Sequence, residues 1–209
     1  MSTAPVRVAI LTFDGFNEID SLVAYHILNR VRRPGWQVRI ASPGPQVTSM
    51  NGLVIEAQAT LEEACQADAV LVGSGTATRA LTEDGALLGR LRFDPARQLV
   101  GAQCSGALLL ARLGLLGSMP ACTDLKTRPW LEKLGTRVLD RPFHASGNLA
   151  TAGGCLASQY LAAWVLTRLA GPEAAADALH YVAPVGEKES YVSRMWDHVR
   201  PSIAEAVPA

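Results

Sequence analysis

Short apolar runs alternate with helix-like segments along this chain. Residues Val6–Phe13 form an apolar run, a helical segment follows at Glu18–Val31, and further apolar runs lie at Trp36–Ala41 and Ala69–Val72. Such runs are expected of parallel strands whose two faces are both covered. Strands interleaved with helices predict an α/β fold, with a doubly wound, mostly parallel sheet flanked by helices.

The rest of the chain keeps to this alternation. A hairpin is predicted over Val47–Ala57, turning at Asn51-Gly52. The remaining predicted elements are a helix at Leu61–Gln66, one or two helices over Thr78–Phe93, strands at Gln98–Ala102, His144–Ser146 and Leu149–Thr151, and helices at Leu156–Leu169 and Lys188–Val199. Because we find no internal repeat, low-complexity tract or long linker, residues 1–209 are expected to form one domain.

A cysteine lies where a predicted strand passes directly into a predicted helix, in the segment Leu99–Ala107 (LVGAQCSGA). Ala102 and Gly106 keep the turn free of bulk, which is typical of a nucleophile elbow that lifts Cys104 onto the helix N-terminus. The helix dipole and free N–H groups favour a thiolate there, so we expect a pKa below the ~8.5 of free cysteine. The alternative is a cysteine that is buried only to pack.

Composition narrows the function classes. Lys and Arg together number 19, as do Asp and Glu, so no net charge predicts binding to nucleic acid or to an anionic membrane. The 4 cysteines have neither C-x-x-C pairing nor metal-ligand spacing, which predicts no metal site and a reduced, cytoplasmic setting. We also expect no signal peptide, and no membrane span because no apolar run approaches ~18 residues.

Two more segments follow predicted strands. Asp20 lies in the first turns of a helix, where its carboxyl either points back over the sheet edge or complements the helix dipole. The turn Gly73-Ser74-Gly75-Thr76 is not a dinucleotide fingerprint, because the third glycine position is occupied by Thr78. It can present a backbone N–H to a developing oxyanion, and it can also be a tight turn in which a threonine caps a helix.

Four segments occur in an order that resembles a known superfamily. They are Phe13–Leu28 (FDGFNEIDSLVAYHIL), Gly73–Thr76 followed by Ala80–Asp84, Gln103–Ala107 (QCSGA) and Gly147–Gly154 (GNLATAGG). Together they are similar to the first-strand exit, the P-G-G-x-G…L turn, the C-[TS]-G-[AS] elbow and the G-N-L-x-T-x-G-G segment of the ThiJ/PfpI superfamily, and within it of the isonitrile hydratase branch. The resemblance implies a flavodoxin-like, class I glutamine amidotransferase-like fold.

The resemblance also implies site residues. In the isonitrile hydratase branch the matching positions would make Cys104 the nucleophile, Asp20 the acid that faces it and Ser105 the hydroxyl that follows the cysteine. Backbone N–H groups of Gly75 and Ser105 would steady developing negative charge. Many relatives carry a histidine where this chain has Asp124, so a Cys–His–Asp triad is not expected from the family position.

The sequence leaves the roles of three other residues open. Asp124 either faces the site as an additional carboxylate near Cys104, or points away and caps the segment Leu125–Leu134. His26 and His144 could approach Cys104 from elsewhere in the fold, although an unplaced histidine is more often a surface or core residue.

Two further cysteines, Cys65 and Cys155, are expected to be packing residues. The segment after Tyr181 lacks the proline-rich stretch associated with the isonitrile hydratase branch.

Two unlike functions follow. The first is a cysteine-dependent hydratase or hydrolase, in which Cys104 attacks an electrophilic carbon such as that of an isonitrile and Asp20 moves the protons. The second is a redox or carbonyl-stress protein, a thiol sensor or a glyoxalase- or deglycase-like enzyme. A sensor domain without catalysis is a third reading, weakened because nothing after Leu169 is long enough for a DNA-reading helix pair.

Partners and cofactors follow the same reasoning. We expect a small-molecule substrate and no cofactor. The resemblance implies a homodimer, to which the apolar hairpin and the Trp196-bearing tail could contribute contacts, although core packing explains those residues equally well.

Overall fold

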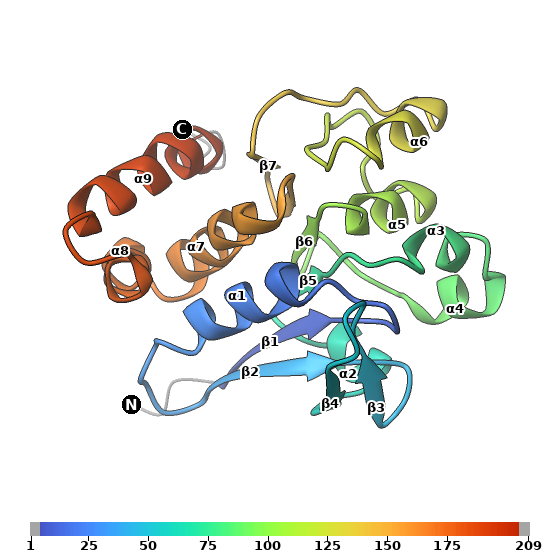
Figure 1. Cartoon of the computed structure of the whole chain (residues 1–209), viewed down its shortest axis with the longest axis horizontal. Coiled ribbons are helices and arrows are strands. Elements are labelled where there is room, and N and C mark those ends of the chain that lie inside the picture. The colour runs from blue at the N-terminus through green and yellow to red at the C-terminus, as the bar shows by residue number, and fades with distance from the viewer. Residues whose placement is uncertain (1–4, 205–209) are drawn as a thin grey trace.

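The computed structural model describes residues 5–204, and a six-stranded sheet lies at its centre (Figure 1). The strand order is β2-β1-β5-β6-β8-β7, and β3 and β4 form a separate hairpin. The strands are β1 (Val6–Leu11), β2 (Trp36–Ala41), β3 (Gln46–Thr48), β4 (Val54–Glu56), β5 (Ala69–Val72), β6 (Leu99–Gln103), β7 (Phe143–Ser146) and β8 (Leu149–Ala152). Neighbouring strands from β2 to β8 are parallel, and β7 is antiparallel to β8. The predicted fold class, a mostly parallel α/β sheet, is confirmed.

Helices cover both faces of this sheet. They are α1 (Glu18–Leu28), α2 (Leu61–Cys65), α3 (Thr78–Leu81), α4 (Gly85–Arg90), α5 (Gly106–Arg112), α6 (Arg128–Lys133), the 3-10 turn η1 (Cys155–Ala157), α7 (Ser158–Leu169), α8 (Pro172–Val182) and α9 (Lys188–Ala204). Figure 1 shows α7, α8 and α9 to the left of the sheet, and α3, α4 and α5 to its right. None of the helices in the described residues is both long and apolar enough to cross a bilayer.

The burial of β1 shows why its sequence is apolar at successive positions. Val8 and Ile10 pack into the core cluster that includes α1 and α7, whereas Ala9 and Leu11 pack into the cluster on the opposite face, with α2 and α5. Successive side chains of a strand point to opposite faces, so a strand buried on both sides needs apolar residues at every position. The sequence pattern therefore predicted the two-sided sheet correctly.

The largest differences from the predicted elements lie at their ends. The first helix ends at Leu28 rather than Val31, with Asn29 as its C-cap. The helical region Thr78–Phe93 divides into α3 and α4, since the Asp84 side chain accepts hydrogen bonds from Ala86 N and Leu87 N and starts a new helix. The hairpin strands are shorter than predicted. The helix α8 was not predicted.

The end of the chain covers the outer side of β7. Helix α9 extends past the predicted Lys188–Val199 to Ala204, and Ser202 Oγ accepts a hydrogen bond of 3.1 Å from Ala145 N of β7. Met195 and Val199 of the same helix are fully buried. The expectations that concern the extreme N-terminus and a domain spanning 1–209 include residues 1–4 and 205–209, which lie outside the described residues.

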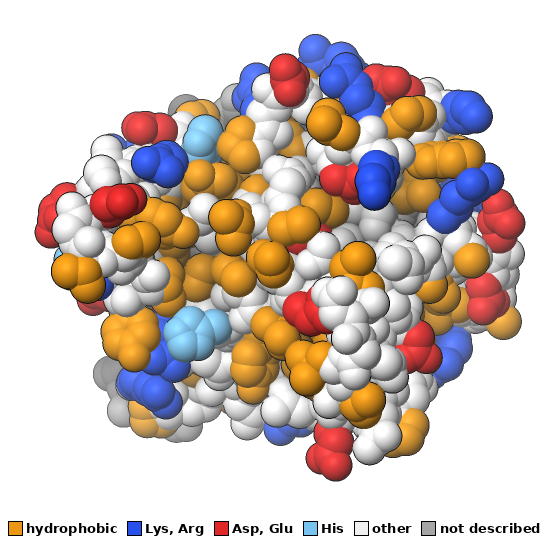
Figure 2. Space-filling view, viewed as in Figure 1, with side chains coloured by type: hydrophobic (Ala, Val, Ile, Leu, Met, Phe, Trp, Pro, Cys, Tyr) orange, Lys and Arg blue, Asp and Glu red, His pale blue; other side chains and the backbone are white. Residues whose placement is uncertain are grey.

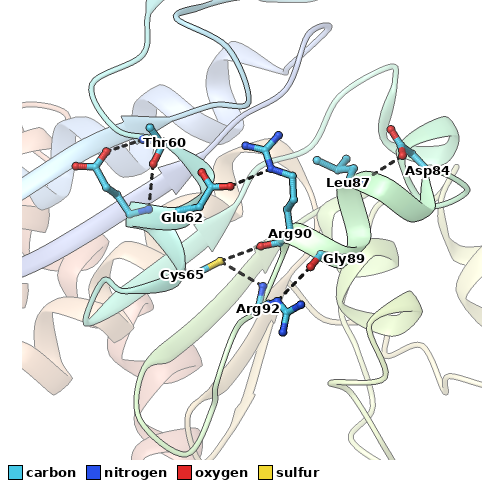
Figure 3. A network of polar contacts seen from close by, with 9 residues as sticks. Thr60, Glu62, Cys65, Asp84, Leu87, Gly89, Arg90 and Arg92 are labelled. Atoms are coloured by element: carbon cyan, nitrogen blue, oxygen red, sulfur yellow. Dashed lines mark hydrogen bonds and ion pairs between the residues drawn. The ribbon is translucent and has the colours of Figure 1, made fainter.

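A network of polar contacts joins α2 to α4 and to the segment that follows α4 (Figure 3). Thr60 caps α2 through a capping box with Glu63, and Glu62 pairs with Arg90 at 2.9 Å. Cys65 lies inside this network: its sulfur accepts a hydrogen bond from Arg92 N at 3.3 Å and donates one to Arg90 O at 3.5 Å. Cys65 is thus a buried structural cysteine, as the sequence predicted.

Candidate active site

The carboxyl ends of four parallel strands meet at one edge of the sheet. β1 leads to Asn17 and Asp20, β5 leads to Ser74, and β8 leads to Gly153–Cys155, while β6 ends directly before Cys104. The strand order reverses between β1 and β5, and open α/β sheets place their ligand sites in the crevice at such a reversal. The candidate site lies beside this crevice.

Cys104 occupies the sharp turn between β6 and α5. Its φ of 45° is positive, and it is the one non-glycine residue with a positive φ in the part of the chain that the structure describes. The turn is held by Cys104 N, which donates to Ala152 O at 2.8 Å, and by Thr123 Oγ1, which donates to Cys104 O at 2.8 Å. A side chain held in this backbone region at a strand–helix junction is the geometry of a nucleophile elbow.

The second residue after Cys104 has to be glycine. A Cβ on Gly106 would lie 2.5 Å from Val72 O and 2.7 Å from Gly73 O, closer than carbon and oxygen atoms can approach. The absence of a side chain lets α5 begin directly against the end of β5. The predicted reason for small residues in this turn is therefore confirmed for Gly106.

Asp20 is placed beside Cys104 by the first turn of α1. Asn17 is the N-cap of this helix, and its Oδ1 accepts hydrogen bonds from Ile19 N and Asp20 N, so the Asp20 carboxyl is not the cap. Asp20 is only 2% exposed, and Ser74 Oγ donates a short hydrogen bond to its Oδ2. Its Oδ1 is buried without a conventional hydrogen-bond partner among the described residues.

Cys155 completes a cluster that the sequence analysis missed. The sulfurs of Cys104 and Cys155 and a carboxylate oxygen of Asp20 all lie within 4.8 Å of one another. Asn17 Nδ2 donates to Cys155 Sγ at 3.3 Å. The expectation that Cys155 only packs is wrong, because the residue is half-buried and lines a cavity. The available signal was its place just after the Gly153-Gly154 turn that follows a strand.

The three-residue cluster also bears on metal binding. Two thiols and a carboxylate at this spacing are donors that a soft divalent ion accepts, and the sequence spacing could not reveal them because three separate segments supply them. Among the described residues this is the one group of such donors close enough together to share an ion.

The charges around Cys104 oppose its ionisation. Burial raises the pKa of the Cys104 thiol, and the negative charges of Asp20 and Asp124 raise it further. The expectation of a lowered pKa is therefore wrong, because burial and two carboxylates outweigh the helix N-terminus. Burial also raises the pKa of Asp20, although the hydrogen bond from Ser74 acts in the opposite direction. The cluster is consequently built to hold little negative charge.

Gln103 ties the elbow to the neighbouring turn. Its Nε2 donates to Gly154 O at 2.8 Å and to Cys104 Sγ at 3.4 Å. An N–H directed at the sulfur stabilises negative charge there, and the same amide holds the segment that carries Cys155. Gln103 is thus a second residue of the site that the sequence analysis did not single out.

Ser105 and Gly75 form a hydrogen-bonded support beside the thiol. Gly75 N donates to Ser105 Oγ at 3.3 Å, and Ser105 Oγ donates in turn to Thr78 Oγ1 at 3.0 Å. The Gly75 N–H, which the sequence suggested as a donor to a developing oxyanion, is therefore directed at the Ser105 hydroxyl in this structure. Gly75 packs so tightly that a Cβ there would lie 2.5 Å from Gly15 O.

A cavity of about 880 Å³ opens over this cluster. Cys104, Ser105, Gly75 and Cys155 line its floor. The wall contributed by residues 123–128 and 138–142 contains apolar and charged side chains, namely Leu125, Val138, Leu139, Pro142, Asp124, Asp140, Lys126, Arg128 and Arg141. The cavity can hold a small molecule that has both an apolar part and a charged part.

Asp124 combines the two roles that the sequence left open. It lines the cavity, and its Oδ1 accepts hydrogen bonds of 2.9 Å from Lys126 N and Thr127 N, which closes the turn before α6. Its charge also reaches the thiol, since it raises the pKa of Cys104. Asp124 therefore supports a loop and adds negative charge to the site at the same time.

Neither candidate histidine lines this cavity. His144 lies on β7 and His26 on α1, where His26 lines an apolar groove with Val182. No imidazole is therefore placed to act as a base in the cavity within the described residues, and Asp20 is the carboxyl closest to the two thiols.

Comparisons with known proteins agree with this architecture. Residues 6–168 match the DJ-1/PfpI family. A Streptomyces lividans protein described as an uncharacterized protein in the cpoL 5' region is 28% identical over 128 residues, which cover 59% of this chain and 90% of that protein.

Solved structures of similar fold include Schizosaccharomyces pombe DJ-1, with a TM-score of 0.74 and 19% identity over 86% of this chain and 100% of that one. A THiJ/PfpI family protein from Pseudomonas syringae has a TM-score of 0.74 and 21% identity, covering 97% of this chain and 91% of that one. These structures share the fold, and the family match extends over most of the sequence. The chain belongs to the DJ-1/PfpI family.

Proposed function

We propose that the protein is a cysteine-dependent hydratase of small electrophilic molecules, with an isonitrile as the substrate type. One observation carries this proposal: a buried carboxyl, Asp20, lies within 4.8 Å of the elbow thiol Cys104 at the floor of a cavity. A nucleophile and a proton donor held side by side are what addition to a carbon–nitrogen bond requires.

The first step forms a bond between Cys104 and the terminal isonitrile carbon. The Cys104 proton passes to Asp20 as the sulfur attacks. This transfer leaves the net charge of the cluster unchanged, so it avoids the cost of adding a second negative charge to a buried site. Asp20 then delivers the proton to the substrate, which gives a thioimidate. The Gln103 amide, 3.4 Å from the sulfur, favours charge on sulfur during the transfer.

Water completes the reaction. Asp20 takes a proton from a water molecule, whose oxygen adds to the thioimidate carbon, and delivers that proton to the substrate nitrogen. The carbon–sulfur bond then breaks as the added hydroxyl becomes a carbonyl, and the hydroxyl proton passes by way of Asp20 to the Cys104 sulfur. The products are an N-substituted formamide and the free Cys104 thiol, so one water is consumed in each cycle. Backbone N–H groups of Gly75 and Ser105 are the proposed stabilisers of developing negative charge; Gly75 N would exchange its present acceptor, Ser105 Oγ, for the substrate.

A substrate panel tests the proposal. Isonitriles, 2-oxoaldehydes, and amide and ester probes are offered to the wild type, to Cys104→Ser and to Cys122→Ser. Cys122 is a suitable control because it is fully buried and does not line the cavity. Turnover of isonitriles that is lost only in Cys104→Ser supports the proposal. Turnover of 2-oxoaldehydes alone would replace it with the second candidate, a carbonyl-stress enzyme that uses the same thiol.

We also propose that the protein acts as a homodimer. An apolar groove on α1, lined by Ile19, Leu22, Val23 and Ile27 together with Val182, supports a second copy as the partner. Figure 2 shows hydrophobic side chains gathered over the part of this face where α1, α7 and α8 lie. The Trp196 contribution expected from the sequence has less support, since Trp196 packs against the core. Sedimentation of the wild type and of Ile19→Asp decides the matter.

The proposed location is the cytoplasm. Cys65, Cys104, Cys122 and Cys155 are all free thiols, and a reducing compartment keeps thiols in that state.

A further inference from the structure

The second thiol of the site has no task in the hydration scheme. Cys155 Sγ lies within 4.8 Å of Cys104 Sγ and of the Asp20 carboxylate, and no other cysteine lines the cavity. We propose that Cys104 and Cys155 are a redox pair: a peroxide oxidises Cys104, and Cys155 then closes a reversible disulfide with it. This inference rests on the proposed role of Cys104 as the reactive thiol, but not on the identity of the substrate.

The first step is oxidation of Cys104 by a peroxide, ROOH. The Cys104 sulfur attacks the distal oxygen, so that a sulfur–oxygen bond forms while the oxygen–oxygen bond breaks. The Cys104 proton passes to Asp20 and from Asp20 to the departing RO⁻, which leaves as ROH. Cys104 becomes a sulfenic acid, and the peroxide is reduced by two electrons.

The second step uses Cys155. Its sulfur attacks the Cys104 sulfur, the sulfur–sulfur bond forms, and the sulfur–oxygen bond breaks. The hydroxide leaves with the Cys155 proton as water. Asp20 lies beside both thiols and can carry this proton. Burial and the Asp20 charge raise the pKa of the Cys155 thiol, and the N–H of Asn17, 3.3 Å from Cys155 Sγ, acts in the opposite direction.

The backbone beside Cys155 allows the sulfurs to approach. A disulfide requires the two sulfurs to come to about 2.05 Å, so one of them has to move inward. Cys155 follows Gly154, which has a φ of 89° and open space around the position of a Cβ, and it opens the short turn η1 rather than a long helix. Cys104 is fixed by the elbow and Gly154 is held by Gln103, so the Cys155 side chain and the backbone that follows Gly154 are the parts that move.

Exposure makes the pair reversible. Cys155 is half-buried and lines the cavity floor, so an external thiol that enters the cavity can reach its sulfur, whereas Cys104 is only 4% exposed. Cys65 and Cys122 are buried away from the cavity, and Cys65 is enclosed by Arg90 and Arg92 (Figure 3). The pairing is therefore specific for Cys155.

The experiment treats reduced wild type, Cys155→Ser and Cys122→Ser with hydrogen peroxide in a chelator-containing buffer, and reads intact mass, free thiols and cross-linked peptides. The wild type and Cys122→Ser are expected to lose two free thiols and two hydrogen atoms, to give a Cys104–Cys155 linked peptide, and to recover both thiols with dithiothreitol. With dimedone present, Cys155→Ser is expected to form the dimedone adduct at Cys104; without dimedone, excess peroxide is expected to add two oxygen atoms there, which dithiothreitol does not remove.

Two results would overturn the inference. One is a wild type that gains oxygen on Cys104 while Cys155 stays a free thiol, and the other is a disulfide that involves Cys65 or Cys122. Cys155→Ala repeats the measurement in case the serine variant does not fold. Because mass and thiol counts need no turnover, a failed substrate panel leaves this test intact, and a missing disulfide leaves the hydratase proposal intact.

Discussion

Ser74 Oγ donates a hydrogen bond to Asp20 Oδ2, which joins the carboxyl end of β5 to the first turn of α1. The bond crosses the crevice where the strand order reverses. It also opposes the effect of burial on the Asp20 pKa, because a donor to a carboxylate stabilises the charged form. One hydroxyl thus holds the carboxyl beside Cys104 in place and favours its charged form, against the larger effect of burial.

Ser74→Ala is expected to raise the pKa of Asp20 still further. The proposed cycle needs a cluster that has lost one proton, so the rising limb of kcat/KM against pH should move to higher pH. Ser49→Ala is the matched control, because Ser49 makes the same kind of hydrogen bond to Glu18 and lies outside the cavity. A limb that moves equally in both variants would contradict the role of Ser74.

Asp20→Asn should change two measurements in opposite directions. Turnover is expected to fall at least ~100-fold, the scale for loss of a general acid–base group. Iodoacetamide labelling of Cys104 at a fixed pH should become faster, because a neighbouring negative charge that raises the thiol pKa has been removed. Near-normal turnover with a loss of only about 0.3–1 kcal/mol of stability would instead indicate a helix-dipole role.

Two variants separate the effect of Asp124 on the Cys104 pKa from its effect on the stability of the loop. Asn accepts the same hydrogen bonds from Lys126 N and Thr127 N, so Asp124→Asn should keep the stability of the fold while lowering the Cys104 pKa. Asp124→Ala should lower that pKa equally and also destabilise the protein by about 0.5–2 kcal/mol, the range for a lost cap. Alkylation profiles and urea midpoints of both variants check this, and equal midpoints would remove the structural role.

Alkaline pH should destabilise the protein through its buried thiols. Burial raises the pKa of Cys104, and raises that of Cys122 to about 12, whereas a cysteine in the unfolded chain titrates near ~8.5. Above that pH the unfolded state releases protons that the native state retains, so the free energy of unfolding falls as pH rises. Urea denaturation at increasing pH should show a weaker decline in Cys122→Ala, and an unchanged slope would contradict the linkage.

Gly106→Ala should destabilise the protein, with a cost on the order of 1–3 kcal/mol typical of overpacking, because the new Cβ would clash with Val72 O. The matched control is Gly89→Ala within α4, where no atom lies within 4 Å of the added Cβ. That change should stabilise the helix by up to about 1 kcal/mol. Thermal denaturation of the two variants checks the contrast, which would fail if both shifted the midpoint in the same direction.

The sequence predicted the sheet well because a strand that is buried on two faces requires a continuous run of apolar residues. The runs Trp36–Ala41 and Ala69–Val72 coincide with β2 and β5. Helix ends were less predictable, since they depend on single side chains such as Asp84, whose capping bonds separate α4 from α3. Helix α8 begins at Pro172, a residue type favoured at the first position of a helix, and buries Ala175, Ala178 and Leu179 on one face, so its signal was present in the sequence and was overlooked.

The site was predictable where a residue stood in a recognisable turn and not where it depended on packing. Cys104 stands in an elbow that the local sequence describes. Cys155 reaches the cavity, and Gln103 contacts Gly154, only because β8 pairs with β6, a relationship between segments distant along the chain. The direction of the Cys104 pKa depends on the same long-range packing, because Asp20 and Asp124 come from other segments.

Helix α9 covers the edge of the sheet formed by β7, a position that a further strand could otherwise occupy. β7 is an edge strand, and edge strands expose N–H and C=O groups that can pair with another molecule. Ser202 accepts the outward N–H of Ala145, and the buried side chains Met195 and Val199 keep the helix in place. By covering this edge strand, α9 hinders edge-to-edge pairing of β7 with another molecule.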